Sequence, residues 1–245
     1  MTSLEATNPL QTTQTSVEIL QCVAESGGAT LMELDDHVTV SKGALYNHLS
    51  TLVDLGLLER TEGTYRVDVR VLALGEQARA AIPGFPSIRR TLQNLAMTSG
   101  EFATLVMARD GTPIVVETMA GELVEQHWMS VGQELPLATT AAGKVVLATL
   151  PEERAEALMR EQTSHDPESL LEEIRTVRVQ GLAFSRGTFQ DDQYSVAAPI
   201  NSDEQLSYVV SLTGPKDRLH GKSLQQDIAG LVVSASNEIK RDILS

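Results

Sequence analysis

Cysteine, basic residues, aromatic residues and long apolar runs are all scarce in this chain, and most of these scarcities exclude a class of protein. The single cysteine, Cys22, has no partner for an internal disulfide, and its place in a helical pattern predicts a buried thiol. No run of about 18 apolar residues is present, which excludes a membrane-spanning helix. Residues 1–15 lack the basic start and apolar centre of a signal peptide, so we predict a cytoplasmic protein.

Positive charge is scarce as well. The chain has 5 lysines against 14 arginines and a formal net charge of −14, and its first 70 residues contain four basic and ten acidic residues. A DNA-binding domain is ordinarily basic, so one interpretation is that the chain does not bind DNA. The other is a salt-rich cytoplasm, that of a halophilic archaeon, because a Debye length of about 3 Å at ~1 M salt screens the repulsion.

No arrangement of side chains indicates catalysis or metal binding. The adjacent Asp191 and Asp192 favour a solvated turn over a pair of catalytic carboxylates. Neither a G-x-S-x-G motif nor a cysteine–histidine arrangement is present. The histidines lack the paired spacing of metal ligands and stand at His37, His48, His127, His165 and His220. We therefore predict that the chain is not an enzyme and needs neither a cofactor nor a metal.

One stretch, residues 39–56, has the pattern of a helix with an apolar face and a polar face. Leu45, Leu49 and Leu52 recur at the spacing of one helical face. Ser41 is a candidate N-cap, and Gly56 is a candidate residue just past the C-terminus. Alone, the pattern also fits an ordinary surface helix. The polar face offers groups suited to phosphates and base edges, namely Ser41, Lys42, Gly43, Tyr46, Asn47 and Ser50.

The neighbouring segments favour a winged helix-turn-helix domain over residues 14–68. Two apolar stripes predict a helix and a short helix upstream, marked by Val17, Leu20 and Val23 and by Leu31, Leu34 and Val38. Downstream, residues 57–67 read as a hairpin with a glycine near its tip. Arg60 and Arg66 near that tip suit contact with phosphates or the minor groove. The order of elements carries this prediction, and no single residue does.

The rest of the chain divides at residues 83–86, Pro-Gly-Phe-Pro, which break a helix. We expect a flexible tail over residues 1–13 and a linker helix over residues 69–84, which suits dimerisation but also fits a passive spacer. Residues 85–245 are predicted to form an α+β domain on an antiparallel sheet. Its expected helices are 88–98, 139–149, 151–162, 168–180 and one from 222, and its expected strands are 102–108, 114–119, 123–129, 182–186, 196–200 and 206–213.

Residues 138–144, Ala-Thr-Thr-Ala-Ala-Gly-Lys, superficially resemble a phosphate-binding loop. The first glycine of that motif would fall at Ala138, and Val145 replaces the required hydroxyl residue, so the match fails. The segment still begins a predicted helix, whose free N–H groups and dipole attract a small anion. A plain N-cap with tight packing of the small residues is the alternative.

The sequence resembles the IclR family of transcriptional regulators. The resemblance begins with residues 136–148, Pro-Leu-Ala-Thr-Thr-Ala-Ala-Gly-Lys-Val-Val-Leu-Ala, followed by Leu150 and Pro151. Residues 174–183, 196–200 and 211–215 support it, in the right order and at the right spacing. With the winged helix and the linker, the resemblance extends from about residue 14 to the C-terminus.

The resemblance implies a dimeric regulator, or a dimer of dimers, that binds a palindromic operator in double-stranded DNA. It further implies a GAF-like C-terminal domain that binds a small metabolite, commonly an organic acid. In the family this ligand lies at the start of the helix of the Ala-Gly-Lys motif. Carried over, the site comprises backbone N–H groups of Ala141 and Ala142 and the side chains of Ser185, Ser195, Ser211 and Thr213. We add Trp128 and Met129 as an apolar wall, although core packing explains the tryptophan equally well.

Three departures from the family pattern bear on the effector. Ser185, Arg186 and Asp192 stand where relatives usually carry an acidic pair and a glycine, and Ala138 replaces a frequent histidine. Arg186 would strengthen binding of a carboxylate if it points inward, and otherwise indicates a different ligand or none. Two rival functions stay open, a constitutive or architectural DNA-binding protein with an empty sensor domain and a metabolite-processing enzyme.

Overall fold

The computed structural model describes residues 9–125, 129–162, 167–200 and 206–244. The chain forms two compact units, Met1–Ala81 and Ile82–Ser245, and each is described by itself.

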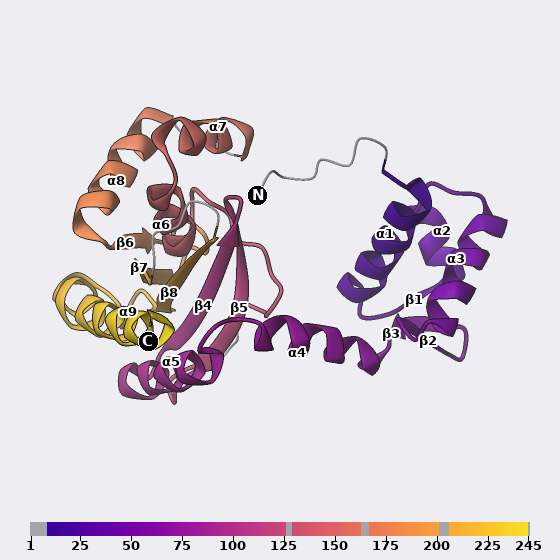
Figure 1. Cartoon of the computed structure of the whole chain (residues 1–245), viewed down its shortest axis with the longest axis horizontal. Helices are drawn as coiled ribbons and strands as arrows, with labels where there is room; N and C mark the ends of the chain where they lie inside the picture. The colour runs from indigo at the N-terminus through magenta and orange to yellow at the C-terminus, as the bar shows by residue number, and fades with distance from the viewer. Residues whose placement is uncertain (1–8, 126–128, 163–166, 201–205, 245) are drawn as a thin grey trace. The chain divides into compact units, whose positions relative to one another are not determined.

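The N-terminal unit packs three helices on a small antiparallel sheet of order β1-β3-β2 (Figure 1). Its elements are α1 (Gln11–Glu25), β1 (Ala29–Thr30), α2 (Leu31–His37), α3 (Lys42–Asp54), β2 (Leu58–Thr61) and β3 (Thr64–Val67). The predicted tail over residues 1–13 is too long, because α1 already begins at Gln11. The predicted apolar stripe of α1 is correct only in part: Val23 is buried and Leu20 packs against the core, but Val17 is exposed, and Thr15 and Ile19 complete the buried face.

The ends of α2 and α3 are set by local hydrogen bonds. Thr30 and Glu33 form a capping box at the start of α2. The Ser41 hydroxyl accepts a hydrogen bond from the Ala44 N–H, which confirms Ser41 as the N-cap of α3. Gly56 follows α3 with a φ of 71°, the left-handed conformation that suits glycine after a helix. Leu45, Leu49 and Leu52 are buried as predicted.

The wing is a tight hairpin between β2 and β3. Both turn residues, Glu62 and Gly63, have positive φ, the conformation of a two-residue turn that matches the twist of the strands. The sequence did not predict β1, which pairs Ala29 with Tyr65 as a third strand. Cys22 is only partly buried, so the prediction of a buried thiol is wrong.

The segment after the wing is helical, as expected. A short 3-10 turn, Val69–Val71, leads into α4 (Leu72–Ala80). None of the side chains of α4 is buried, and Val69, Leu72 and Leu74 are all more than half exposed.

The C-terminal unit is built on one antiparallel sheet of order β5-β4-β8-β7-β6. Its strands are β4 (Phe102–Arg109), β5 (Thr112–Ala120), β6 (Ala183–Arg186), β7 (Gln193–Pro199) and β8 (Leu206–Pro215). Its helices are α5 (Phe85–Ser99), α6 (Ala141–Thr149), α7 (Glu152–Gln162), α8 (Pro167–Gln180), the π-helix η2 (Ser223–Ile228) and α9 (Ala229–Leu244). The predicted α+β class is therefore confirmed.

Helices cover both faces of this sheet (Figure 1). On one face, α5 and α9 pack against alternate residues such as Leu105, Val196 and Leu212. On the other face, α6 and α8 enclose a second core that includes Val106 and Ala197. Because successive strand residues point to opposite faces, each strand contributes to both cores.

One predicted strand is wrong. Residues 121–125 hold a turn in place of the strand: the Val124 N–H donates to the Gly121 carbonyl, and the Leu123 N–H donates to the Gly100 carbonyl. Met129 also lies outside any strand, and residues 126–128 are not among the described residues. Because both N–H groups already donate to these carbonyls, neither is free to pair with a neighbouring strand.

Candidate functional site

The polar face of α3 is open to solvent. The predicted DNA-contacting residues on it are all exposed, namely Ser41, Lys42, Gly43, Tyr46, Asn47 and Ser50. A Cβ atom on Gly43 would meet nothing within 4 Å, so the backbone there is accessible to a close approach. The apolar face meanwhile holds α3 on the core, so the helix presents a fixed row of polar groups.

Two of these residues already have partners within the unit. The Ser41 hydroxyl caps α3, so it serves helix stability first. Lys42 lies 3.3 Å from an Asp35 carboxylate oxygen, and its side chain is 80% exposed. Such an exposed pair contributes little to stability, so the ammonium can leave Asp35 for a phosphate.

The two wing arginines point to opposite faces of the small sheet. The Arg60 guanidinium stacks 5.4 Å from the centre of the Tyr65 ring, its cross-strand neighbour. Arg60 also lines a shallow hollow of about 120 Å³ together with Tyr46 and Ser50 of α3. Arg66 lies on the other face, and its aliphatic stem covers Gly28. A Cβ atom on Gly28 would lie 3.1 Å from Cγ of Arg66. The structure thus brings Arg60, but not Arg66, beside α3.

In the C-terminal unit, the start of α6 is capped and buried. The Thr140 hydroxyl accepts a hydrogen bond from the Gly143 N–H at 3.0 Å and donates one to the Pro136 carbonyl at 2.7 Å. Ala141 and Ala142 are buried. No hydrogen bond to either N–H group is made within the described residues, as expected for the first turn of a helix. The N-cap and the anion site, which the sequence left as alternatives, are therefore compatible. The cap uses the N–H of Gly143, whereas an anion would use those of Ala141 and Ala142.

Below α6, the sheet carries a face of buried hydroxyl groups. Ser185, Ser195 and Thr213 lie opposite one another on β6, β7 and β8, and Ser211 pairs with Thr104 of β4 in the next row. All five are at most 9% exposed. We call this set the hydroxyl face, and its members are Thr104, Ser185, Ser195, Ser211 and Thr213.

The hydroxyl face is not internally satisfied. The hydroxyls of Thr104 and Thr213 are buried without a hydrogen-bond partner in the described part of the chain, as is Oε1 of Gln193. Gln193 lies on the same face of β7 as Ser195, two residues away. Buried polar atoms are normally paired, so three orphaned atoms on one face indicate a place for a bound molecule.

The remaining predicted effector residues have different roles. Ser185 donates a hydrogen bond to the Thr139 carbonyl at 2.8 Å and contacts the Thr188 hydroxyl at 2.7 Å, so it fixes the segment before α6. Met129 is 8% exposed and belongs to the core beneath α6, consistent with an apolar wall. Trp128 lies outside the described residues.

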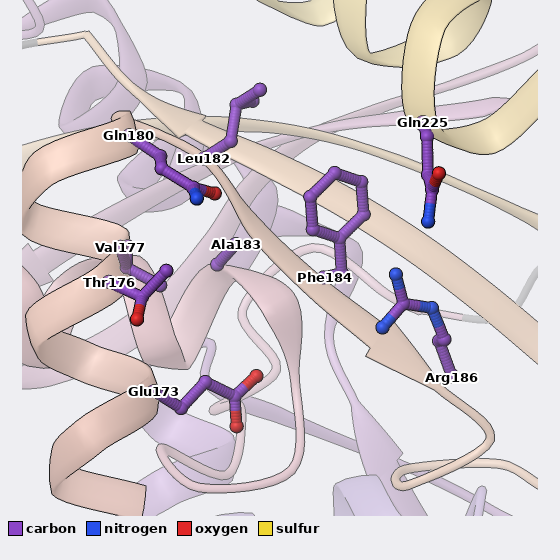
Figure 2. Close-up of a pocket in the computed structure, with 9 residues that line it drawn as sticks. All are labelled: Glu173, Thr176, Val177, Gln180, Leu182, Ala183, Phe184, Arg186 and Gln225. Carbon is purple, nitrogen blue, oxygen red and sulfur yellow. The ribbon is translucent and has the colours of Figure 1, made fainter. Parts of the chain in front are cut away.

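Arg186 does not point toward the hydroxyl face. Its guanidinium stacks over the Phe184 ring at 5.3 Å, on the opposite side of β6 from Ser185. Figure 2 shows Phe184 and Arg186 side by side, with Gln225 of η2 beyond them. They line a cavity of about 440 Å³ at the free edge of the sheet, between α8 and η2. The conditional expectation that Arg186 strengthens carboxylate binding at the hydroxyl face is therefore not met.

A smaller cavity, of about 310 Å³, lies beside Gln193. Arg218 lines it and donates two hydrogen bonds to the buried Glu101 carboxylate at 2.7 and 2.8 Å, which raises the pKa of the arginine. Arg218 also donates to the Leu123 carbonyl at 3.2 Å, so it ties the turn at residues 121–125 to the end of β8. The turn that replaces the predicted strand is thus a wall of this cavity.

Sequence reasoning missed Thr104 and Gln193. Thr104 is the one hydroxyl residue in the apolar strand Phe-Ala-Thr-Leu-Val-Met-Ala, a signal that was available. Gln193 carried no such signal, because a glutamine at the start of a strand is ordinarily exposed. Within the described residues, no group of three or more acidic, histidine or cysteine side chains could hold a metal ion. Across the same part of the chain, no helix is long and apolar enough to span a membrane.

A winged helix-turn-helix unit followed by an α+β unit with a buried polar face is typical of one class of protein: transcriptional regulators with a DNA-binding domain and an effector-binding domain. Comparison with known families agrees on both units: residues 14–62 match the IclR helix-turn-helix domain, and residues 85–241 match the bacterial transcriptional regulator IclR C-terminal domain. The chain belongs to the IclR family, and its homologues are transcriptional regulators, not enzymes.

Individual relatives support this assignment. The chain is 32% identical to the probable HTH-type transcriptional regulator ArcR of Halobacterium salinarum, over 92% of this chain and 90% of that protein. It shares its fold with an IclR transcriptional regulator from Alicyclobacillus acidocaldarius, with a TM-score of 0.83 at 20% identity, covering 96% of this chain and 99% of the other. An IclR homologue from Microbacterium hydrocarbonoxydans, crystallised with 4-hydroxybenzoate, has a TM-score of 0.80 at 15% identity over the same shares.

Proposed function

We propose that the chain binds an operator in double-stranded DNA through α3 and changes its affinity when a small organic acid binds below α6. The observation that carries the DNA half is the exposed polar face of α3, held rigid by its apolar face. Asn47, with an amide that can pair with an adenine edge, and Lys42, with a charge that suits phosphate, are the central contacts. Gly43, Tyr46 and Ser50 complete the row.

The wing arginines take separate tasks in this proposal. Arg60 lies beside α3 and would contact a phosphate that flanks the base pairs under the helix. Arg66 projects from the other face of the wing and would contact the backbone or minor groove farther out. Few cations support binding, so we expect affinity to depend on side-chain fit more than on bulk charge attraction. The cytoplasm of a halophile, where repulsion is screened, suits a chain of net charge −14.

Pairing of two chains would complete the DNA-binding surface. Val69, Leu72 and Leu74 expose apolar side chains along and just before α4, and burial of such side chains favours association. We therefore propose that α4 contributes to a homodimer interface, alone or within a dimer of dimers. A dimer would place two copies of α3 on the half-sites of a palindromic operator.

The effector half rests on the start of α6. The N–H groups of Ala141 and Ala142 and the positive end of the helix dipole suit a carboxylate. Ser195, Ser211 and Thr213 offer hydroxyls to the rest of the molecule, and Met129 an apolar contact. The homologue crystallised with 4-hydroxybenzoate supports a small acid as the class of ligand.

The DNA half is tested with Asn47→Ala combined with Lys42→Ala. We expect this double variant to lose the operator footprint, while its far-UV circular dichroism stays that of the wild type. The matched control is Gln21→Ala, because Gln21 is an exposed amide on α1 of the same unit. An unchanged footprint for the double variant would refute α3 as the reading element.

The effector half is tested with Ser211→Ala in thermal-shift titrations against a panel of small organic acids. We expect the acid that stabilises the wild type to bind Ser211→Ala about tenfold more weakly. One hydrogen bond to a charged or polar ligand contributes about 1.4 kcal/mol to the binding free energy. Ser236→Ala is the control, because Ser236 is a buried serine on α9, over the opposite sheet face. Equal midpoints for Ser211→Ala and wild type would show that the site is misplaced.

A further inference from the structure

The carboxamide of Gln193 is an unexplained polar group. The residue is 7% exposed, yet its Oε1 atom accepts no hydrogen bond from any described residue. A buried carbonyl oxygen that lacks a donor destabilises the fold, because it has lost its hydrogen bonds to water. Such an arrangement is sustained where a ligand supplies the donor.

Gln193 occupies a defined place relative to the proposed acid site. It lies on the hydroxyl-bearing side of β7, and two residues along an extended strand separate it from Ser195 by about 7 Å. Ser195 is the neighbour of Ser185, whose hydrogen bond to Thr139 holds the segment that starts α6. Gln193 therefore lies one row beyond Ser195, at the edge of the hydroxyl face away from Thr104 and Ser211.

The cavity beside Gln193 offers acceptors rather than free cations. Its one arginine, Arg218, is engaged by the Glu101 carboxylate and by the Leu123 carbonyl. Asp192 and Glu125 also line the cavity, and Asp192 is paired with Lys216 outside it. A second anionic group would therefore be repelled here, whereas a hydroxyl or amino group would find an oxygen to bond to.

We propose that Gln193 determines effector specificity by accepting a hydrogen bond from the end of the ligand opposite its carboxylate. The preferred effector is then a small acid that carries a hydroxyl or amino group at the end opposite its acid group. This inference rests on the proposed effector site, and it adds that a plain fatty or dicarboxylic acid is a poor ligand.

The test uses two acids of equal heavy-atom count, 6-hydroxyhexanoate and heptanoate, which differ in one terminal hydroxyl. We expect the wild-type chain to bind the hydroxy acid about tenfold more tightly in calorimetric titrations, because only the hydroxyl satisfies Oε1. Gln193→Leu removes the acceptor at similar size, so the preference should disappear or reverse. Gln180→Leu is the control, an exposed glutamine on α8 that lines the other cavity (Figure 2).

A second measurement separates recognition from a structural role. If Gln193 serves the ligand, Gln193→Leu without ligand should melt at the wild-type temperature or above it, because the orphaned oxygen is gone. A lowered midpoint would show a structural role and overturn the proposal.

The failures are also distinguishable. Equal binding of both acids to the wild type, weakened alike by Ser211→Ala, would overturn the role of Gln193 and leave the acid site intact. Absence of binding by either acid would overturn both.

Discussion

Lys144 offers a sharp test of how the effector-binding unit is held together. This residue of the Ala-Gly-Lys motif is buried in α6, with a side chain only 6% exposed. Its Nζ donates hydrogen bonds to a Glu173 carboxylate oxygen at 2.8 Å and to the Phe184 carbonyl at 3.2 Å. One ammonium thereby ties α6 to α8 and to the edge strand β6.

The perturbation is Lys144→Met, which keeps the length of the side chain and removes its charge. Loss of a hydrogen bond to a charged group costs about 1.5–3 kcal/mol, and loss of the bond to the Phe184 carbonyl about 1 kcal/mol. Relief of the desolvated ammonium offsets part of this, and Glu173, which is 43% exposed, regains water. We expect a net loss of about 2 kcal/mol, or a fall of about 6 °C in Tm for a unit of this size.

The assay is urea unfolding at fixed salt, followed by tryptophan fluorescence. The only tryptophan in the sequence, Trp128, falls within the residue range of the C-terminal unit. Lys216→Met is the matched control, because Lys216 pairs with Asp192 at the surface and should cost less than about 1 kcal/mol. A loss for Lys144→Met no larger than that of the control would refute the reasoning.

Two further predictions concern the glycines and acid stability. Gly143→Ala should destabilise the C-terminal unit by about 3 kcal/mol in calorimetry, because the new Cβ would lie 2.6 Å from the backbone of Leu137. Gly75→Ala on exposed α4 should instead stabilise its unit by up to about 1 kcal/mol, because its Cβ would meet no other atom. Changes of the same sign for both variants would contradict this. Hydrogen bonds from the Arg70 side chain and N–H hold the pKa of Asp68 at about 2, so this contribution to stability is complete above the ordinary value of 3.8 and disappears as pH falls toward 2. Carbon NMR should locate that pKa, and acid unfolding of Asp68→Asn that parallels the wild type through this window would contradict the linkage.

Most elements were predictable because their signals are local. The leucine spacing and the Ser41 cap of α3, the paired turn residues of the wing, and the breaker at residues 83–86 each act within a few residues of chain. The same reasoning failed for residues 123–129. We expected a strand there, but the Leu123 N–H donates to the Gly100 carbonyl, a contact that forms only when the end of α5 is in place, and the Val124 N–H closes a turn on the Gly121 carbonyl.

The faces of the elements were less predictable than their existence. On α1, Val17 was expected on the buried face with Val23, yet Val17 is exposed and the core contains Thr15 and Ile19 beside Val23. The direction of the Arg186 side chain could not be decided from the sequence. The register of β6 places Ser185 on the hydroxyl face and therefore places Arg186 on the opposite face. A shift of one residue in a strand exchanges its two faces, and short strands carry too little pattern to fix this.

By itself, the sequence determined most of the elements, the fold class and the family, and it singled out α3 as the proposed reading helix. These follow from short-range periodicity, capping and the spacing of motifs, which need no knowledge of distant contacts. Only the tertiary structure decided that Thr104 and Gln193 join Ser211 and Thr213 on one buried face below α6. The physical reason is that strand pairing brings together residues that are up to about a hundred positions apart, and burial then turns ordinary polar side chains into groups that need a partner.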